Sequence, residues 1–584
     1  MYKMLTDKEK INYATGLIVS VAILNKYKDA KLNQVLATEK DFNVDLDLNR
    51  QFVSTKDFTE LEEIIKSLLE KKLVVETKAV DLNTAKEIFK DNPYKLKQLL
   101  EFDNNVPLIY VNDLVDINYG GVEDILIGST VKNTFYELLN SSSAYYENNA
   151  NNKQLDRING IGFKNKTELK EFKAKLEEAK KRDHRKIGRE LDLFMFDDTA
   201  PGMPYWLPNG LILFNNLVDF WRDVHKKNNY LEFSAPQLNN SELWKTSGHW
   251  DHYKNDMFVF NDADGNEQAL KPMSCPNAIK IFSSKPRSYK DFPLRFSDID
   301  VIHRNEASGA LHGLLRVRMF RQDDSHNFVM ESQIKNEFSN IFEIAKYMYE
   351  AFGLTFRPTL STRPDDFMGD INLWNQAEKD LKEVLDENFG ENGYDINQGD
   401  GAFYGPKIDL YMTDSLGRKW QMGTIQLDFQ LPRRFDLKYT NKDGESEIPV
   451  IVHRTIYGSL ERFVGILTEH YNGAYPMWIA PKQVNIIPVH DGSELMRYVK
   501  DINEELEDSK VRSVIDDSNE KIGYKIRRSQ IEKIPTTFII GNNEMEEQLI
   551  SYRNYGSQIT NTESYDKAMG KIKTLSKLPQ YKRR

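Results

Sequence analysis

The spacing of apolar residues predicts a mixture of helices and strands near the start of the chain. Apolar side chains recur at helical spacing in residues 7–28 and in residues 59–72, which predicts two amphipathic helices. Residues 106–110 form a short, mostly apolar run of strand length. Together these elements predict an α/β domain over residues 1–165.

A densely charged segment follows at residues 166–190. Its apolar residues at helical spacing are Leu169, Phe172, Leu176 and Ala179. Because charged residues surround them, the segment is predicted to be a solvent-exposed linker helix. It could be a simple spacer, or it could orient a neighbouring domain or a bound RNA.

The pattern changes again in the rest of the chain. Short strands alternate with helices from about residue 191 to residue 480, and residues 482–489, 510–515 and 536–541 are predicted to be buried strands separated by helices. This alternation predicts a small, mostly parallel sheet in residues 481–584. The predicted fold class is therefore α+β and α/β, in several domains.

Composition excludes a wholly disordered chain and a uniformly basic nucleic-acid-binding protein. Of the 584 residues, 40% are apolar and 29% are charged, which excludes wholesale disorder. The net charge is −10; residues 481–584 contain 18 basic and 16 acidic residues, a charge of +2, which leaves −12 for the remainder. Any contact with nucleic acid must therefore be local rather than a uniform electrostatic attraction.

Hydropathy and cysteine content predict the compartment. No apolar run approaches the roughly 18 residues that a membrane span needs, so no membrane partner is predicted. The run at residues 16–24 could be the core of a signal peptide, but no small-residue cleavage site follows it. The single cysteine, Cys275, cannot form an internal disulfide, which favours a reducing and hence cytoplasmic location.

Histidine and cysteine are confined to the later part of the chain. The first of the ten histidines is His184, and Cys275 also lies beyond that point. Residues 1–183 therefore offer no thiol nucleophile, no imidazole base and no soft metal ligand.

Residues 315–328 are the most informative segment. In an uninterrupted strand, alternate residues share one face. The even-numbered residues are Arg316, Arg318, Phe320, Gln322, Asp324 and His326. Such a polar face is costly to cover unless a ligand fills it. A purely structural role is the alternative, although Val317 and Met319 already supply an apolar face.

Two further arginines lie at predicted boundaries. Arg304 and Glu306 follow a predicted strand, and arginine suits phosphate because its planar fork donates two hydrogen bonds. Alone, this pair could equally be a surface ion pair. Ser459 is predicted to cap a helix that has Arg462 in its first turn, where the helix dipole disfavours a cation. Arg462 therefore needs an anionic partner, either a phosphate or an acidic side chain.

Ten segments closely resemble motifs of the threonyl-tRNA synthetases, a family of class II aminoacyl-tRNA synthetases. They are GHWD at 248–251, KPMSCP at 271–276, HRNE at 303–306, residues 311–326, LSTRP at 360–364, GAFYGPK at 401–407, GTIQLDF at 423–429, VHR at 452–454, GSLER at 458–462 and NEKIG at 519–523. Residues 143–157 resemble the end of the family's editing domain. The resemblance implies an editing-like domain at 1–165, a linker helix at 166–190, a class II catalytic domain with an antiparallel sheet and flanking helices at 191–480, and an anticodon-binding domain at 481–584.

The resemblance implies an ATP site. Arg304 would hold the α-phosphate of ATP and the carboxylate of threonine. Glu306 would bind the adenine amino group, and Phe320 would stack on the adenine ring. Arg316 and Arg462 would bind the γ-phosphate end, and Mg²⁺ would accompany ATP.

The resemblance also implies residues at the amino-acid end of the site. Gln322 and Tyr404 would orient threonine, and Asp324 would accept a hydrogen bond from its hydroxyl group. Gln426 would contribute to the threonine site and, with His249, would lie near the terminal adenosine of the tRNA. The implied catalytic set is Arg304, Arg462, Gln322 and His249.

Three potential metal ligands are 51 and 127 residues apart: Cys275, His326 and His453. Spacing alone does not predict a metal site, but the family's Cys-His-His zinc corresponds to these residues. One Zn²⁺ per chain is therefore implied, with an open position for the amino and hydroxyl groups of threonine. Valine lacks the hydroxyl group and would be rejected. Serine lacks only one methyl group, a difference of about 1–3 kcal/mol, and would be accepted at times.

The family usually hydrolyses mischarged serine at an editing site built from His-x-x-x-His and Cys-x-x-x-His pairs. The matching segments begin at Asn12 and Asn118 and contain none of these four residues. The resemblance also leads us to expect that the small domain that often precedes the editing domain is absent. We therefore expect a threonine–tRNA ligase without post-transfer editing. Four departures in the catalytic part could tune ATP affinity or inhibitor binding: Asn277, Ala278, Met319 and Arg321.

The C-terminal motif implies contacts with tRNA. The implied residues are Asn519, Lys521, Lys525 and Arg527. The expected partners are tRNA for threonine, ATP, L-threonine and a second copy of the chain. Two alternatives are a non-catalytic RNA-binding paralogue and a synthetase for proline or serine. The intact arginines argue against the first, and the Cys-His-His triad and residues 401–407 argue against the second.

Overall fold

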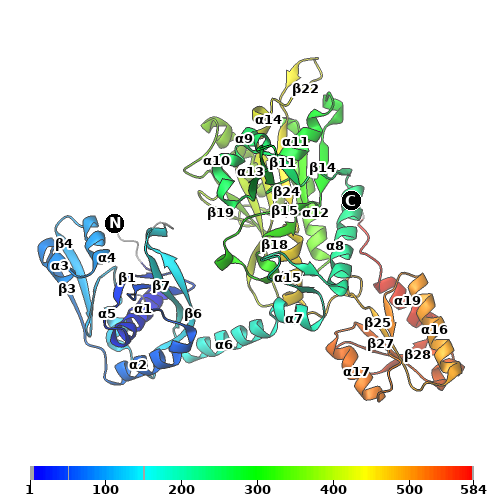
Figure 1. Ribbon diagram of the computed structural model, residues 1–584, viewed down its shortest axis with the longest axis horizontal. Helices are drawn as coiled ribbons and strands as arrows, with labels where there is room; N and C mark the ends of the chain where they lie inside the picture. Colours follow the sequence, from blue (N-terminus) through cyan, green and yellow to red (C-terminus); the bar gives the residue numbers. More distant parts are fainter. Residues whose placement is uncertain (1–4, 50, 149–151, 582–584) are drawn as a thin grey trace. The chain divides into compact units, whose positions relative to one another are not determined.

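The computed structural model describes residues 5–49, 51–148 and 152–581. The chain folds into two compact units, Met1–Glu178 and Ala179–Arg584 (Figure 1). Residues 149–151, within the segment 143–157 singled out in the sequence, and residues 582–584 lie outside the described residues.

Helix α1 (Asp7–Lys26) forms the centre of the first unit. It begins with a capping box, in which Thr6 and Glu9 each accept a hydrogen bond from the other's backbone N–H. Nearly all its side chains from Asn12 onward are buried, so the prediction of an amphipathic helix is wrong. The reason is that α1 contacts strands of two sheets as well as helix α2 (Phe58–Glu70). Helix α2 does bury a single apolar stripe, as predicted.

Both sheets of the first unit are antiparallel. One has the strand order β1-β2-β7-β6 and the other β3-β4-β5. The strands are β1 (Lys31–Ala37), β2 (Phe42–Asp47), β3 (Val75–Asp81), β4 (Asn105–Val111), β5 (Leu114–Ile117), β6 (Phe135–Tyr145) and β7 (Gln154–Phe163), and the short helices are α3 (Leu82–Ile88), α4 (Pro93–Gln98) and α5 (Glu123–Gly128). Strand β4 contains the predicted strand 106–110.

The predicted linker helix is two helices. Helix α6 (Lys166–Lys181) has no buried residue, which confirms its predicted exposure. Helix α7 (His184–Glu190) is separate, because the side chain of Asp183 caps it by accepting a hydrogen bond from the N–H of Arg185. Unlike α6, helix α7 buries His184 and Ile187 in the second unit.

An eight-stranded sheet forms the centre of the second unit, in the order β10-β14-β17-β24-β21-β20-β18-β19. Its strands are β10 (Tyr230–Glu232), β14 (Leu294–Asp298), β17 (Asp324–Val329), β18 (Phe356–Ser361), β19 (Asp395–Asn397), β20 (Lys407–Thr413), β21 (Lys419–Asp428) and β24 (Val450–Thr455). The six inner strands are antiparallel, and only the two edge strands pair in parallel.

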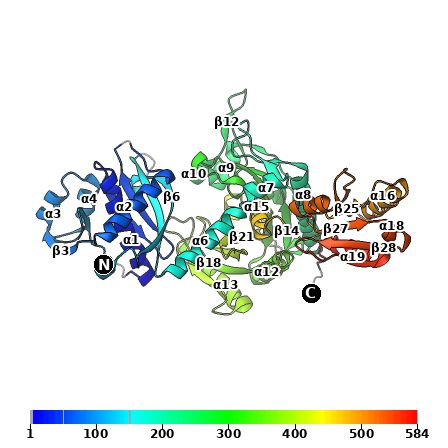
Figure 2. The same ribbon diagram turned by 90° about the horizontal axis from the view of Figure 1, so that it is seen from below.

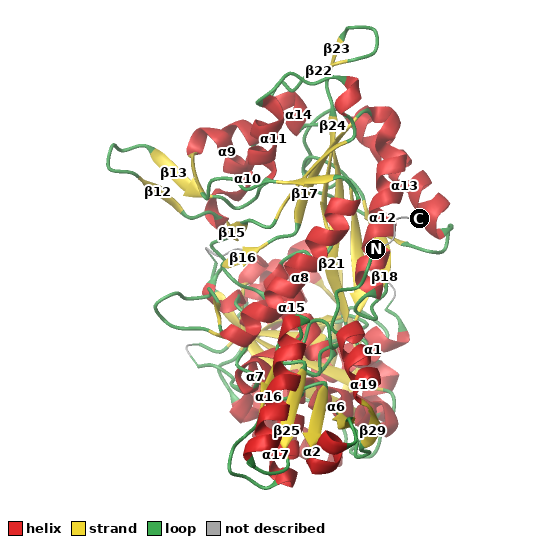
Figure 3. Cartoon of the chain, turned by 90° about the vertical axis from the view of Figure 1, so that its right-hand side faces the viewer, coloured by secondary structure: helices red, strands yellow, loops and turns green. Residues whose placement is uncertain are grey.

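Long helices cover this sheet (Figure 3). They are α8 (Pro208–Lys227), α12 (Ile334–Glu350), α13 (Ile371–Phe389) and α15 (Leu460–His470). Their apolar residues form one core with those of the sheet. The mixed α+β architecture predicted for this part of the chain is confirmed.

Shorter elements complete this part of the chain. The helices are α9 (Ser241–Ser247), α10 (His249–Tyr253), α11 (Cys275–Ser283) and α14 (Leu431–Arg434). The strands are β8 (Phe194–Met195), β9 (Tyr205–Trp206), β11 (Leu238–Asn240), β12 (Val259–Asn261), β13 (Glu267–Leu270), β15 (Val301–His303), β16 (Met319–Arg321), β22 (Tyr439–Thr440) and β23 (Ser446–Glu447).

The segment 315–328 is not a single strand, so its predicted even-numbered face is wrong in part. Strand β16 pairs with β15, and the chain then turns and joins the large sheet as β17. Before the turn, the guanidinium group of Arg318 donates to the backbone oxygens of Glu306 and Pro201. Arg318 is thereby directed away from Phe320 and the residues that follow it.

Residues after about 481 form a small five-stranded sheet in the order β26-β25-β27-β28-β29 (Figure 2). The elements are β25 (Val484–Pro488), α16 (Ser493–Asp508), β26 (Ser513–Ile515), α17 (Ile522–Ile531), β27 (Thr536–Ile540), α18 (Asn542–Glu546), β28 (Leu549–Asn554), β29 (Asn561–Ser564) and α19 (Tyr565–Leu575). The three predicted strands are confirmed and are parallel, whereas β28 and β29 are antiparallel additions. No helix among the described residues combines the length and apolar character that a membrane crossing requires.

We expect Leu17→Ala to destabilise the first unit by about 2–5 kcal/mol, because Leu17 is fully buried on α1 and its loss leaves a cavity. Hydrogen-exchange mass spectrometry of peptides from this unit in increasing urea would measure the change. Leu100→Ala is the control, since Leu100 is 76% exposed and should change the free energy by less than about 0.5 kcal/mol. Equal protection of α1 in the two variants would contradict the central role of this helix.

Candidate functional site

A cavity of about 670 Å³ lies in the second unit. Its walls come from the β15–β16 hairpin and the residues around it, from strands β17, β21 and β24, and from the start of helix α15. Twelve of the residues singled out in the sequence line it: Cys275, Arg304, Glu306, Arg316, Phe320, Gln322, Asp324, His326, Tyr404, Gln426, His453 and Arg462. One concave site therefore contains nearly all the predicted catalytic-domain residues.

Arginines form one end of the cavity. Arg316 pairs with Glu306 at 2.8 Å, and the guanidinium group of Arg304 lies 5.3 Å from the centre of the Phe320 ring. The buried Nε of Arg462 has no hydrogen-bond partner among the described residues. Burial, and then the neighbouring Arg316, lower the pKa of Arg462. This uncompensated positive charge suits an anionic ligand.

Two sets of contacts fix the start of α15, and only the first of them was predicted from the sequence. The predicted cap is confirmed, since Ser459 Oγ accepts a hydrogen bond from the N–H of Arg462. In addition, the buried carboxylate of Asp323 accepts hydrogen bonds from the backbone N–H groups of Ile456, Tyr457 and Gly458 at 2.9–3.1 Å. The only sequence signal for this role is a second aspartate next to Asp324.

A buried arginine–histidine pair lies behind Asp323 and was also missed. Arg454 Nη1 is 4.0 Å from the Asp323 carboxylate, and Arg454 Nη2 donates to His225 Nε2 at 2.8 Å. His225 Nδ1 in turn donates to the backbone oxygen of Trp221 on α8. Burial, together with Arg454, lowers the pKa of His225, which keeps the imidazole neutral and able to accept from arginine.

Polar side chains line the other end of the cavity, and contacts with neighbouring residues hold them in place. Tyr404 donates to Gln426 Oε1 at 2.7 Å, and Gln322 pairs with Ser459 as an isolated β-bridge. Burial raises the pKa of Asp324, whereas the nearby His453 lowers it. These side chains present hydrogen-bonding groups to the cavity at fixed positions.

The ligand atoms of Cys275, His326 and His453 lie within 4.8 Å of one another. The pairing of β17 with β24 places the two histidines directly opposite each other, which explains how residues so far apart in the sequence meet. His453 Nε2 donates a hydrogen bond to Asp428 Oδ2 at 2.8 Å, whereas the buried Nδ1 of His326 has no hydrogen-bond partner among the described residues.

This donor set fits Zn²⁺. One sulfur and two imidazoles are ligands that zinc prefers, and three protein ligands leave one position open. Burial lowers the pKa of His326, so its ring is neutral and can offer a lone pair. The carboxylate of Asp428 orients His453 in the manner typical of metal-bound histidines.

His249 is not brought into the cavity lining. It is buried beneath it, where its Nδ1 contacts Ser247 Oγ at 2.7 Å and its ring lies 6.3 Å from that of Phe403. Burial lowers the pKa of His249 to about 3, with a further contribution from His453. The ring is therefore neutral and lies behind the lining, with its centre 6.1 Å from that of Tyr253, which does line the cavity.

The C-terminal residues implied in tRNA contacts are not equivalent. Asn519, Lys521 and Arg527 are exposed around the start of helix α17. Lys525 is only 5% exposed and its ammonium group donates to the backbone oxygen of Asp516 at 3.0 Å. Lys525 therefore stabilises the fold of this part of the chain and does not present its ammonium group at the surface.

The asparagines of the first unit are bonded to the protein itself. Asn12 is fully buried; its Nδ2 donates to the backbone oxygen of Thr38 and its Oδ1 accepts from the N–H of Gly162. Asn118 donates to Glu123 and accepts from the N–H of Gly120. All the hydrogen-bonding atoms of the two side-chain amides thus have partners.

Comparison with known proteins agrees with this arrangement. Residues 258–471 match the tRNA synthetase class II core domain (G, H, P, S and T), and residues 483–575 match an anticodon-binding domain. The fold and the cavity are therefore those of a class II aminoacyl-tRNA synthetase.

Relatives narrow the class further. The chain is 42% identical over 554 residues to the threonine–tRNA ligase of Caldanaerobacter subterraneus subsp. tengcongensis, covering 94% of this chain and 84% of that protein. It is 42% identical over 550 residues to the threonine–tRNA ligase of Clostridioides difficile, covering 94% and 84%. A solved structure titled as the RNA binding domain of threonyl-tRNA synthetase from Cryptosporidium parvum Iowa II is 39% identical, with a TM-score of 0.65, and covers 68% of this chain and 99% of that chain. The chain belongs to the threonine–tRNA ligase family.

Proposed function

We propose that this threonine–tRNA ligase works in two steps within the cavity: ATP first activates L-threonine as threonyl-adenylate, and the threonyl group then passes to the 3′ end of tRNA. The observation that carries the proposal is the convergence of cationic, aromatic and potential zinc-binding side chains on one 670 Å³ space. The alternative of a non-catalytic RNA-binding protein is disfavoured, because such a protein has no need for an arginine, Arg462, that lines the cavity and whose buried Nε has no hydrogen-bond partner among the described residues.

Arginine placement supports the proposed ATP contacts. Arg304 would bind the α-phosphate and the threonine carboxylate, while Arg316 and Arg462 would bind the γ-phosphate end with Mg²⁺. Phe320 would stack on the adenine, and Glu306 would accept from its amino group. Fixed cations of this kind accelerate the reaction by positioning ATP and by stabilising charge that develops on its phosphates.

Cys275, His326 and His453 would hold one Zn²⁺ per chain, and the bound ion would supply a Lewis acid that recognises the amino and hydroxyl groups of threonine. Asp324, Gln322 and Tyr404, with Gln426, would orient the amino acid around it. The substrate hydroxyl group would be required, which disfavours valine. Serine satisfies the same contacts, so the site would discriminate against it by only about 10- to 200-fold.

The first unit would no longer edit mischarged tRNA. Hydrolysis of an ester needs a group that moves a proton from water, and amide groups such as those of Asn12 and Asn118 do not do so near neutral pH. Two buried ionisable residues of the unit, Lys95 and Asp116, are each 1% exposed and form an ion pair with each other, so neither is available to water. At Gly16, a side chain would meet Val35 Cγ1 at 2.5 Å, so no room remains at this position of α1.

The remaining assignments concern the organisation of the enzyme. We propose an editing-like domain at 1–165, a linker at 166–190, the catalytic domain at 191–480 and the anticodon-binding domain at 481–584, where Asn519, Lys521 and Arg527 would contact tRNA. A homodimer and a cytoplasmic location are proposed from the resemblance to the family and from the single, unpaired cysteine.

Arg304→Ala and Arg462→Ala should each lower threonine-dependent ATP–pyrophosphate exchange by about 100-fold or more, because each removes a charge that stabilises the transition state. Exchange measured with threonine, serine and proline also tests the choice of amino acid. Arg222→Ala is the control, since Arg222 lies in an exposed ion pair with Glu232. Near-normal exchange in either active-site variant would refute the role of that arginine, and faster exchange with proline or serine would refute the choice of threonine.

Protein purified without chelators should contain about one zinc per chain, because three ligands and an open position define one site. Elemental analysis would measure it. Cys275→Ala should lose the metal together with threonine activation, since Cys275 supplies the only sulfur among the three proposed ligands. Full zinc content and full activation in this variant would show that the ligands are assigned incorrectly.

Preformed seryl-tRNA for threonine should be deacylated no faster with this enzyme than without it. The catalytic site is blocked with a non-hydrolysable threonyl-adenylate analogue, so that any hydrolysis reports on the first unit. Deacylation well above the uncatalysed rate would refute the loss of editing, and would mean that amides, carboxylates or the hydroxyl groups of the tRNA itself drive the reaction.

A further inference from the structure

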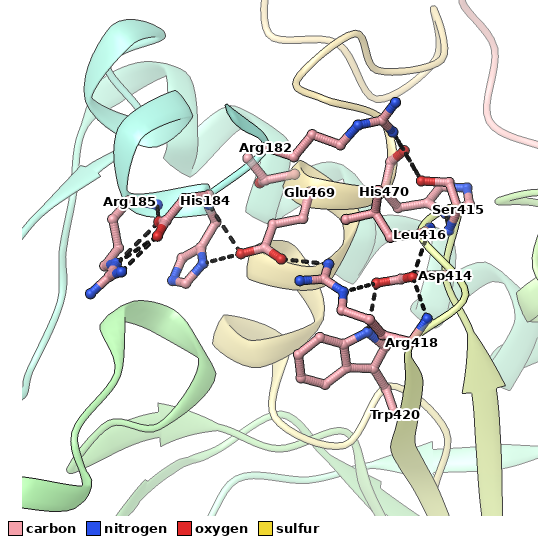
Figure 4. Close-up of polar contacts among 12 residues, drawn as sticks. Arg182, His184, Arg185, Asp414, Ser415, Leu416, Arg418, Trp420, Glu469 and His470 are labelled. Carbon is pink, nitrogen blue, oxygen red and sulfur yellow. Dashed lines mark hydrogen bonds and ion pairs between the residues drawn. The ribbon is translucent and has the colours of Figure 1, made fainter. Parts of the chain in front are cut away.

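His184 occupies a buried position between two parts of the second unit. It is the first residue of α7, and its ring is 0% exposed. Its Nδ1 is 2.7 Å from Glu469 Oε1 on α15, and its Nε2 accepts a hydrogen bond from the backbone N–H of Leu314 at 3.0 Å. Because a backbone N–H can only donate, the ring proton resides on Nδ1 and is donated to Glu469 (Figure 4). Both nitrogens of the neutral ring are thus used.

The hydrogen bond between His184 and Leu314 is linked to the cavity by the two residues that follow Leu314 in the chain. Leu314 lies in the short helix η7 (Gly313–Leu315), and the next two residues, Leu315 and Arg316, line the cavity. Gly313 has a φ of +50°, and a Cβ there would lie 2.2 Å from His184 Nε2. The histidine therefore occupies the space that any side chain at Gly313 would need, which ties the path of this loop to the imidazole.

The hydrogen bond between His184 and Glu469 is linked to the cavity through helix α15. Glu469 lies on α15, two helical turns after Arg462. Its other oxygen, Oε2, pairs with Arg418 Nη2 at 2.6 Å, and Arg418 Nε donates to Asp414 Oδ2 at 2.7 Å (Figure 4). These bonds hold the C-terminal end of α15 against the turn between β20 and β21.

Trp420 connects this network to the arginine of the cavity. Its Nε1 donates to Asp414 Oδ2 at 2.8 Å. The guanidinium groups of Arg418 and Arg462 lie 5.0 and 5.8 Å from the centre of the same indole ring. The side of Arg462 that faces away from the cavity is therefore supported by residues that Glu469 holds in place.

We propose that His184 is a positioning residue for the phosphate end of the ATP site: it fixes the loop that carries Arg316 relative to the helix that carries Arg462. The proposal rests on the proposed function, which assigns these two arginines to ATP. His184 does not line the cavity, so it acts through its neighbours and not on the substrate. Because α7 follows the exposed helix α6, the same residue joins this linker to the ATP site.

Removal of the ring would leave the buried N–H of Leu314 without its partner. Glu469 Oε1 would lose the ring N–H and keep only the backbone N–H of His184, while Oε2 would keep Arg418. An unpaired buried group is costly, so the loop or the helix would move to find another partner. A movement of this kind changes the distance between Arg316 and Arg462, and the affinity for ATP depends on that distance. Threonine binds at the other end of the cavity and would be affected much less.

Two substitutions separate the two contacts. His184→Asn can place an amide N–H near the position of Nδ1 and keep the bond to Glu469, but it cannot reach Leu314. His184→Gln is longer, and its Oε1 can accept from Leu314 N–H at the expense of the bond to Glu469. In ATP–pyrophosphate exchange with the full-length enzyme, we expect His184→Asn to raise the KM for ATP at least about fivefold, with the KM for threonine within about twofold of wild type. His184→Gln should recover part of the ATP affinity.

A double-mutant cycle tests whether His184 acts through Arg316. In the Arg316→Ala background, His184→Asn should raise the KM for ATP by much less than it does alone, since the residue it positions is gone. His312→Asn is the matched control: this neighbouring ring is exposed, lies 6.0 Å from that of His184, and should leave both KM values unchanged. Gly313→Ala should raise the KM for ATP while His184 is intact, which covers the case in which both His184 variants fail to fold.

Three results would overturn the proposal. They are an unchanged KM for ATP in folded His184→Asn, an equal rise in the KM values for ATP and threonine, and full additivity with Arg316→Ala. If the His184 variants do not fold, an unchanged KM for ATP in Gly313→Ala would overturn it. If Arg316→Ala itself leaves the KM for ATP unchanged, the assignment of Arg316 to ATP fails and this proposal fails with it. If Arg316→Ala raises that KM but His184→Asn does not, only the positioning role of His184 is refuted.

Discussion

The catalytic unit depends on one buried carboxylate, that of Asp323. A buried charge is costly unless hydrogen bonds surround it, and Asp323 obtains these from three consecutive backbone N–H groups at the end of β24. Burial still raises the pKa of Asp323 to about 7, although Arg454 and these bonds oppose the shift. The carboxylate thereby joins the turn between β16 and β17 to the start of α15, so that Gln322, Asp324 and Arg462 face one cavity.

Polar atoms in the cavity and those of two asparagines in the first unit differ in how they are paired. In the cavity, buried atoms such as Nδ1 of His326 and Nε of Arg462 have no partner among the described residues. In the first unit, by contrast, the amides of Asn12 and Asn118 have all their partners within the protein. Unpaired buried groups destabilise a fold, and a ligand in the cavity that these two residues line could pair with them. These two amides therefore have their hydrogen-bonding atoms occupied by the protein itself.

The sequence by itself determined which residue types each unit has available for catalysis and metal binding. The absence of histidine and cysteine before His184 limits what the first unit can catalyse, in any fold. The motifs likewise identified the family and twelve residues of the cavity, because residue types at fixed spacing follow from the chemistry of the substrate. Local elements with a clear apolar period, such as α2 and β25, were predictable for the same reason: each depends on neighbours within a few residues.

Only the tertiary structure decided which way individual side chains point and which of them are exposed. The alternating face of residues 315–328 failed at Arg318 because its guanidinium group bonds to the backbone oxygens of Glu306 and Pro201, which lie outside that segment. Helix α1 proved buried on several sides because two sheets pack on it, and Lys525 bonds to the backbone of Asp516 instead of solvent. His184 showed no motif of its own. Its role follows from contacts with Leu314 and Glu469 that form only when distant segments meet, and local sequence patterns carry no information about such contacts.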